Sequence, residues 1–251
     1  HDCLVNADNY GLCVSGLHMH IGSGTDLEHL SQVCAAMEKA AAELGRSLRM
    51  ISAGGGLPIV YEPGDSFVDL GAYHARWDAT RKRLEDRFGH QIRLEIEPGR
   101  YLVGESGYLV AEIRAVKRQG GNTFYLLDAG FNNLARPILY GAYHPISVAP
   151  ADGRADRPIQ PVIVGGPLCE SGDIFTQQEG GFVARRDLPA AAVGDLVVIE
   201  CAGAYGFVMS SNYNSKPLAA EVLIQEGRTD LVRRRQTFEE MIAAEVIPAQ
   251  R

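Results

Sequence analysis

The sequence has few cysteines, few lysines and no long apolar run. Its cysteines form no CxxC pair and no even set, so neither a disulfide framework nor a cysteine zinc motif is indicated. They are Cys3, Cys13, Cys34, Cys169 and Cys201. No stretch approaches the roughly 20 apolar residues that cross a bilayer, and no signal-peptide pattern is present. We therefore expect reduced thiols in a cytoplasmic protein.

Positive charge is also scarce. The net charge of −7 argues against nucleic acid or an anionic membrane as the main partner. The one basic run, residues 233–235, is followed by Glu239 and Glu240, which favours a solvated edge over a binding patch. With 251 residues and 46% hydrophobic content, the chain has room for one large domain or two smaller ones.

Residues 12–115 alternate short apolar runs with helical patterns. Apolar residues at helical spacing predict a helix over 27–44, with Thr25 and Glu28 at capping-box spacing and Gly45 as its C-terminal cap. A second helix is expected over 73–88. The apolar runs around them end in HIGSG, SAGGG and EIEPGR. Such βα units are typical of a parallel (β/α)8 barrel or an open sheet, where the C-terminal strand ends form the functional face.

The second half has a different pattern, with short β-type runs divided by Gly, Pro, Asp and Asn. It predicts a mostly antiparallel β-sheet or barrel and a short helix over 237–246. We therefore place an α/β domain at 1–106 and a β domain at 107–251. The βα units found here cannot close a barrel, which needs about eight, and the chain begins with His1 rather than Met. We expect the N-terminal units of a barrel to be missing, in preference to a small open sheet.

Glycine-containing loops would lie together at the predicted strand ends. Residues 54–56 allow backbone N–H groups to approach an anion, Ser23 adds a hydroxyl donor, and Arg100 adds a guanidinium. A shared phosphate site and ordinary turns are both consistent with this pattern.

Titratable residues lie beside these loops. His18 and His20 share one side of their strand, but no third metal ligand is visible, so a ring stacked on a flat cofactor or a structural histidine is favoured. Glu97 is expected either to bond a protonated ring nitrogen or to pair with an arginine. In the second half, Cys169 and Glu170 lie side by side in GGPLCESGD, an unusual setting for a core cysteine.

Several motifs occur in one order along the chain. They are GLHMHIGSG, SAGGGL, LEIEPGR, DAGFNNLARPILYGAYH, GPLCESGD and GAYGFVMSSNYNSKP. From about Gly16 to its end, the sequence resembles the C-terminal part of the diaminopimelate decarboxylase family of fold-type III pyridoxal-phosphate enzymes. The resemblance implies the C-terminal part of a PLP-binding (β/α)8 TIM barrel followed by a mostly antiparallel β domain. It also implies a carboxy-lyase that converts meso-2,6-diaminopimelate to L-lysine and CO2, the last step of lysine biosynthesis.

Residues that match the family's motifs imply a site for pyridoxal 5′-phosphate. His20 would stack on the pyridine ring, Glu97 would pair with its nitrogen and keep it protonated, and Tyr205 would close over the cofactor. A protonated ring is the better electron sink. Loop residues would surround the phosphate, namely Ser23, Gly55, Gly56, Gly99 and Arg100.

Other matched residues imply a substrate site. Arg136 and Tyr140 would hold a substrate carboxylate, which Arg100 would also reach, because a guanidinium binds a carboxylate in bidentate fashion. Glu170 would bind the far amino group, and Cys169 would be the proton donor at the reacting carbon. In this family both enter the site from the partner subunit, which implies a homodimer with shared active sites.

The chain departs from the family in its lysines. The family's Schiff-base lysine lies in the N-terminal part of the barrel, whereas Lys39, Lys82, Lys117 and Lys216 match no such position. We therefore expect the chain to be a fragment that is inactive alone. The alternatives are another fold-type III PLP decarboxylase or a racemase, or a non-catalytic truncated paralogue that binds a partner.

Overall fold

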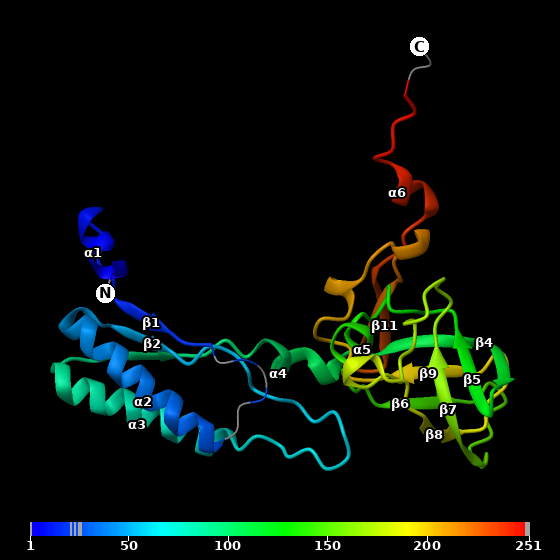
Figure 1. Ribbon diagram of the computed structural model, residues 1–251, viewed down its shortest axis with the longest axis horizontal. Coiled ribbons are helices and arrows are strands. Elements are labelled where there is room, and N and C mark those ends of the chain that lie inside the picture. Colours follow the sequence, from blue (N-terminus) through cyan, green and yellow to red (C-terminus); the bar gives the residue numbers. More distant parts are fainter. Residues whose placement is uncertain (1, 21, 23, 25–26, 249–251) are drawn as a thin grey trace. The chain divides into compact units, whose positions relative to one another are not determined.

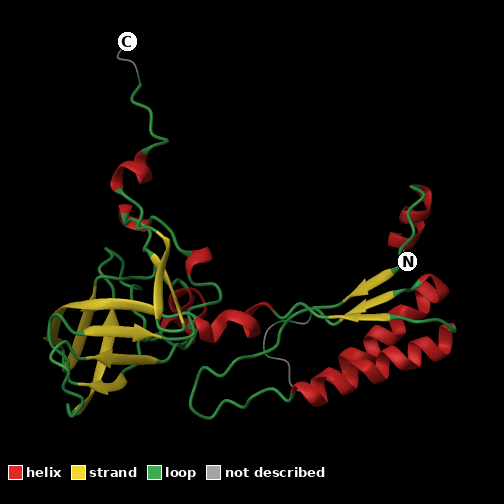
Figure 2. Cartoon of the chain, turned by 180° about the vertical axis from the view of Figure 1, so that it is seen from behind, coloured by secondary structure: helices red, strands yellow, loops and turns green. Residues whose placement is uncertain are grey.

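The computed structural model describes residues 2–20, 22, 24 and 27–248 (Figure 1). The chain forms two compact units, residues 1–103 and 104–251. None of the helices in the described part of the chain has the length and apolar character of a membrane span. The architecture is α/β in the first unit and mostly β in the second, as expected from the two sequence patterns (Figure 2).

Helices and parallel strands alternate in the first unit. Its elements are α1 (Asp2–Asn9), β1 (Gly16–His18), α2 (Leu27–Leu44), η1 (Gly45–Ser47), β2 (Met50–Ser52), α3 (Leu70–Phe88), β3 (Arg93–Glu95) and α4 (Gly99–Val103). Both predicted long helices are confirmed, although α3 begins at Leu70 because Asp69 caps it, accepting the Ala72 N–H at 2.9 Å. The cap expected at Thr25 lies outside the described residues.

The strands of this unit pair in the order β1-β2-β3, all parallel. Ser52, at the end of β2, lies opposite His18 on β1 and Glu95 on β3. The carboxyl ends of all three strands therefore meet at one edge. Helices α2 and α3 pack with the sheet around one core, in which Met37 and Trp77 are at most 1% exposed.

The second unit is built mainly from short strands. Its strands are β4 (Leu109–Gln119), β5 (Asn122–Leu127), β6 (Ile146–Ala149), β7 (Ile159–Gly165), β8 (Arg186–Pro189), β9 (Leu196–Ile199), β10 (Glu221–Gln225) and β11 (Arg228–Arg233). Its α-helices are α5 (Arg136–Tyr140) and α6 (Phe238–Ile242), and its 3-10 helices are η2 (Gly104–Ser106), η3 (Glu179–Gly181), η4 (Phe207–Met209) and η5 (Tyr213–Ser215).

Within residues 104–248, six strands form one sheet in the order β6-β9-β4-β5-β7-β8 (Figure 2). Its edge strands β6 and β8 approach each other, so the sheet curves towards a barrel. All of its pairs are antiparallel except β5 with β7. Strands β6 and β8 were not predicted from the sequence, because ISVA is very short and RDLP contains charged residues and a proline.

A separate hairpin, β10–β11, precedes the last helix. Its turn at Glu226 and Gly227 has positive φ at both residues, the geometry of a type I′ hairpin. The basic run is exposed, which confirms the solvated edge predicted for it, and there Arg233 pairs with Glu221 and Arg234 with Glu240. Helix α6 begins at Phe238, and Thr237 caps it through a complete capping box with Glu240.

Candidate active site

Loops after the parallel strands of the first unit are joined by backbone hydrogen bonds. The Glu97 N–H donates to the Gly54 carbonyl at 2.8 Å, and the Gly55 N–H donates to Nδ1 of His20 at 3.1 Å. The Gly24 N–H donates to the Gly56 carbonyl at 3.0 Å. Of the residues predicted to meet at the strand ends, His20, residues 54–56 and Glu97 are therefore brought together.

The glycines of this edge are required by the close approach of its loops. A Cβ on Gly54, whose φ is +66°, would lie 2.5 Å from the Met19 carbonyl oxygen. A Cβ on Gly55 would lie 2.7 Å from the Glu97 carbonyl oxygen. Any larger side chain at either position would force the three loops apart.

Two histidines of this edge, His18 and His20, each have a polar partner for one ring nitrogen. Because Nδ1 of His20 accepts from Gly55, the proton of its neutral ring is on Nε2. Nε2 of His18 lies 3.1 Å from Oε2 of Glu97, an exposed carboxylate. Glu97 is thus paired with a histidine rather than with the arginine considered from the sequence. Among the described residues, no group of three His, Cys, Asp or Glu side chains is arranged to hold a metal.

Helix α4 carries the remaining candidates of this unit. The Gly99 N–H donates to the Glu97 carbonyl at 2.9 Å, which links the helix start to the strand-end loop. The Arg100 guanidinium lies 5.7 Å from the centre of the Tyr61 ring, in cation–π range. Ser23 lies outside the described residues.

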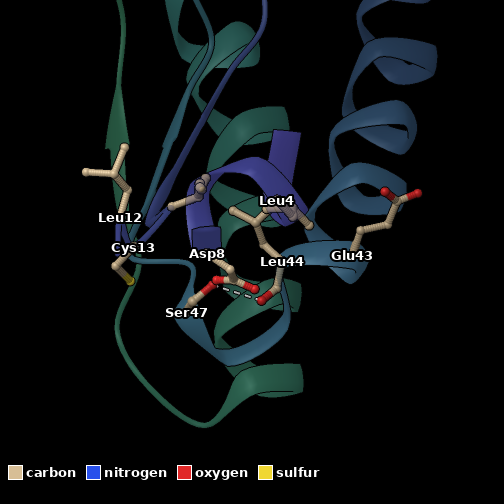
Figure 3. A pocket seen from close by; sticks show the side chains of 9 residues that line it. Leu4, Asp8, Leu12, Cys13, Glu43, Leu44 and Ser47 are labelled. Carbon is tan, nitrogen blue, oxygen red and sulfur yellow. Dashed lines mark hydrogen bonds between the residues drawn. The ribbon is translucent and has the colours of Figure 1, made fainter. Parts of the chain in front are cut away.

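A pocket in the first unit lies at the opposite end of its sheet. It is formed by α1, the segment before β1, and the end of α2 (Figure 3). Ser47 lines it and donates to the Leu44 carbonyl at 2.9 Å. None of the candidate site residues lines this pocket, so it is separate from the strand-end edge.

In the second unit, Arg136 and Tyr140 lie at the two ends of α5 and differ in exposure. Arg136 is 5% exposed, whereas Tyr140 is 62% exposed. Nη1 of Arg136 lies 3.1 Å from Nε2 of His144, whose Nδ1 lies 2.9 Å from the Glu200 carbonyl oxygen. Since a guanidinium only donates, Nε2 must accept, and the neutral His144 carries its proton on Nδ1. His144 therefore orients the guanidinium of Arg136.

The Cys169–Glu170 loop is exposed but held in place. The Cys169 N–H donates to Oδ1 of Asn214 at 2.7 Å. Oε1 of Glu170 accepts from the Gly172 N–H and the Ser171 hydroxyl, both at 3.2 Å. These bonds, that of Gly172 first, hold the pKa of the Glu170 carboxyl below its ordinary value.

Asp173 holds the Cys169–Glu170 loop through hydrogen bonds to its buried side chain. Its side chain is buried, with Oδ1 accepting the Phe131 N–H and Oδ2 accepting the Leu168 N–H, both at 2.8 Å. A Cβ on Gly166 would lie 2.2 Å from Oδ2, so the chain passes directly over the carboxylate. Burial raises the pKa of Asp173.

Tyr205 has an unusual backbone. Its φ is +60°, and the residue is 44% exposed. The next residue, Gly206, has no room for a side chain, because a Cβ there would lie 2.3 Å from the Ala202 carbonyl oxygen. A left-handed non-glycine residue is strained, and such strain is concentrated at functional sites.

Residues that the sequence did not reveal as part of the site are His144, Asp173, Tyr213 and Asn214. Each of them depends on a partner at least 40 residues away in the sequence: His144 on Glu200, Asp173 on Phe131, Tyr213 on Glu170, and Asn214 on Cys169. The only local signal was the polar composition of SSNYNS, which is typical of a left-handed turn.

Comparison with known proteins identifies the family. The family model described as "pyridoxal-dependent decarboxylase, C-terminal sheet domain" matches residues 18–203. The chain belongs to this family. It is 53% identical to the diaminopimelate decarboxylase of Escherichia coli K12 over 234 residues, which are 92% of this chain and 56% of that relative. The chain thus spans about half the length of this curated relative.

Solved structures agree with this pyridoxal-dependent decarboxylase assignment. A diaminopimelate decarboxylase crystal structure superposes with a TM-score of 0.93 and 51% identity, covering 96% of this chain and 58% of that one. The diaminopimelate decarboxylase of Helicobacter pylori complexed with L-lysine gives a TM-score of 0.80 and 32% identity, covering 96% and 57%.

Proposed function

We propose that this chain is the C-terminal part of a diaminopimelate decarboxylase, which releases CO2 from meso-2,6-diaminopimelate to give L-lysine in the last step of lysine biosynthesis. The observation that carries the proposal is the 53% identity to the Escherichia coli relative over 92% of the chain. The first unit would then be the closing part of a PLP-binding (β/α)8 barrel, and the second its β domain.

The strand-end edge of the first unit fits pyridoxal 5′-phosphate. Its loops lack side chains at Gly54 and Gly55, where any Cβ would clash, and its remaining side chains suit a protonated heterocycle. Gly55, Gly56, Gly99, Arg100 and Ser23 would hold the phosphate. When bound, the cofactor supplies an electron sink for the carbanion left by CO2.

Two side chains of this edge would control the cofactor ring. The Glu97 carboxylate would accept a hydrogen bond from the protonated ring nitrogen and keep that nitrogen charged, because a carboxylate favours a neighbouring cation. His20 would stack on the ring, since Gly55 already fixes the orientation of its imidazole. Tyr205, whose φ is +60°, would cover the ring.

The second unit would supply the substrate contacts. Arg136, oriented by His144, and the exposed Tyr140 would hold one carboxylate of the substrate. Glu170, ionised because its pKa is lowered, would bind the far ammonium group. Cys169 would deliver a proton to the reacting carbon.

The exposure of Cys169 and Glu170 supports a homodimer with shared active sites. Cys169 and Glu170 are exposed in the single chain, so a second subunit can reach them. None of the five cysteines, all of which lie within the described residues, is in a disulfide, which is consistent with the proposed cytoplasmic location.

The experiment is a turnover comparison with the full-length protein that carries this chain, loaded with pyridoxal phosphate. Release of CO2 from meso-diaminopimelate should exceed that from L-ornithine and L-arginine, because only the first has a second amino-acid centre for Glu170 and Arg136. Faster consumption of L-ornithine or L-arginine would contradict the proposal and favour another decarboxylase of this fold type. Interconversion of stereoisomers without CO2 release would favour a racemase.

A further inference from the structure

One 3-10 turn contacts both members of the Cys169–Glu170 pair. Oδ1 of Asn214 accepts the Cys169 N–H at 2.7 Å, and the hydroxyl of Tyr213 donates to Oε2 of Glu170 at 3.4 Å. Two adjacent residues of η5 therefore reach two adjacent residues of a loop more than 40 positions earlier in the sequence. The bond from Asn214 holds the backbone of Cys169, and that from Tyr213 holds the side chain of Glu170.

The turn is itself fixed on the second unit. Nδ2 of Asn212 donates to the Lys216 carbonyl at 2.8 Å and to Oε1 of Gln236 at 2.6 Å. The Ser211 N–H donates to the Asn132 carbonyl at 2.9 Å. The turn is thus held at both of its ends and can serve as a platform for the loop.

Asn214 meets two requirements at once. Its φ of +53° lies in the left-handed region, which asparagine, aspartate and glycine tolerate better than other residues. In this conformation its short side chain reaches the Cys169 N–H. Glycine would satisfy the backbone alone, whereas aspartate would satisfy the backbone and keep the acceptor.

Tyr213 completes the orientation of Glu170. Oε1 of Glu170 is held by its own loop, through Ser171 and Gly172, while Oε2 faces the Tyr213 hydroxyl. The Tyr213 ring packs against Phe131, with centroids 4.8 Å apart. Each carboxylate oxygen of Glu170 therefore has a separate partner.

We propose that Asn214 and Tyr213 are the positioning residues of the Cys169–Glu170 pair. Asn214 fixes the backbone from which the thiol projects, and Tyr213 fixes the carboxylate oxygen turned away from the loop. The consequence for catalysis depends on the proposed function, whereas the contacts do not.

The first test measures the contact itself. Hydrogen–deuterium exchange is followed in the peptide covering residues 167–172 of the full-length, cofactor-loaded protein. Asn214→Gly keeps the left-handed backbone and removes the acceptor, so exchange should become about fivefold to tenfold faster, the effect of one lost hydrogen bond. Asn214→Asp should retain wild-type protection. Ser215→Gly, which relaxes the neighbouring left-handed residue of the same turn, is the matched control and should also retain it.

The second test separates the two residues kinetically. Asn214→Gly should lower kcat, because Cys169 acts at the reacting carbon, with Asn214→Asp closer to wild type. Tyr213→Phe should raise KM for meso-diaminopimelate with less effect on kcat, because Glu170 binds the far ammonium group.

Three results decide the outcome. The positioning role would be overturned if amide exchange at residues 167–172 were unchanged in Asn214→Gly. It would also be overturned if kcat and KM of Asn214→Gly and Tyr213→Phe matched those of Ser215→Gly. A wild-type protein that does not decarboxylate meso-diaminopimelate would instead refute the proposed function, and the exchange data would still decide whether Asn214 holds the loop.

Discussion

The two units hold their candidate site residues in different ways. In the first, exposed side chains such as His20 and Glu97 stand on loops that are joined by backbone hydrogen bonds and close glycine contacts. In the second, the Cys169–Glu170 loop is held by the side chains of other residues, above all the buried Asp173 and the left-handed Asn214.

The two units therefore differ in whether the side chains that shape the site also stabilise the fold. In the first unit the framework rests mainly on backbone bonds and close glycine contacts, so replacing a side chain such as that of Glu97 should change the reaction and leave the fold unaffected. In the second unit buried polar side chains shape the site and stabilise the fold together, because an unpaired buried donor is costly.

The largest expected effect is chemical and lies in the first unit. Glu97→Gln removes the charge proposed to keep the cofactor nitrogen protonated, so kcat should fall on the order of 100-fold, the usual scale for a lost electrostatic contact. The unfolding midpoint should not change, because Glu97 is exposed. Glu95→Gln, which loses only an exposed pairing with Arg93, is the control and should retain activity. Equal losses in the two variants would contradict the assignment of Glu97.

The next effect concerns stability and lies in the second unit. Asp173→Ala leaves the Leu168 and Phe131 N–H groups without their acceptor, at a cost of about 1–3 kcal/mol each. Burial raises the pKa of Asp173, so its favourable contribution is full below the ordinary pKa and declines as the pH rises through the raised value. Denaturant unfolding should therefore show a loss that is larger in acid than at neutral pH.

The exposed Asp187 supplies the control for this stability measurement. Asp187→Ala should change the free energy of unfolding by less than about 0.5 kcal/mol. If Asp173→Ala were equally neutral, the second unit would not depend on its buried polar groups, and the contrast between the units would fail.

Local periodicity predicted much of the fold, but it did not predict the polar side chains that hold the Cys169–Glu170 loop. The helices 27–44 and α3 followed from apolar spacing, and the strand ends followed from the glycine runs after them. Strands β6 and β8 were missed because ISVA and RDLP carry no alternating pattern long enough to recognise. The roles proposed for Cys169 and Glu170 came from the family resemblance, whereas Asn214 and Asp173 could not be assigned, because pairs such as Asn214 with Cys169 form only in the folded chain.

The smallest expected effect concerns ion pairs at the surface of each unit, one around Asp78 and one around Glu240. Asp78 on α3 is held by Lys82 and Arg81, and Glu240 on α6 by Arg234, and each carboxyl has its pKa lowered to about 2. For a lowered pKa, the stabilisation is present above the ordinary value and is lost as the pH falls through about 2.

Carboxyl NMR titration checks both groups, and Arg234→Gln should return Glu240 towards its ordinary pKa while leaving Asp78 unchanged. Added salt should weaken both pairs, because both lie at the surface, where dissolved ions screen charges. A salt response confined to one of them would show that the contrast between the units extends to their surfaces, whereas matching responses would restrict it to the buried polar groups around Asp173.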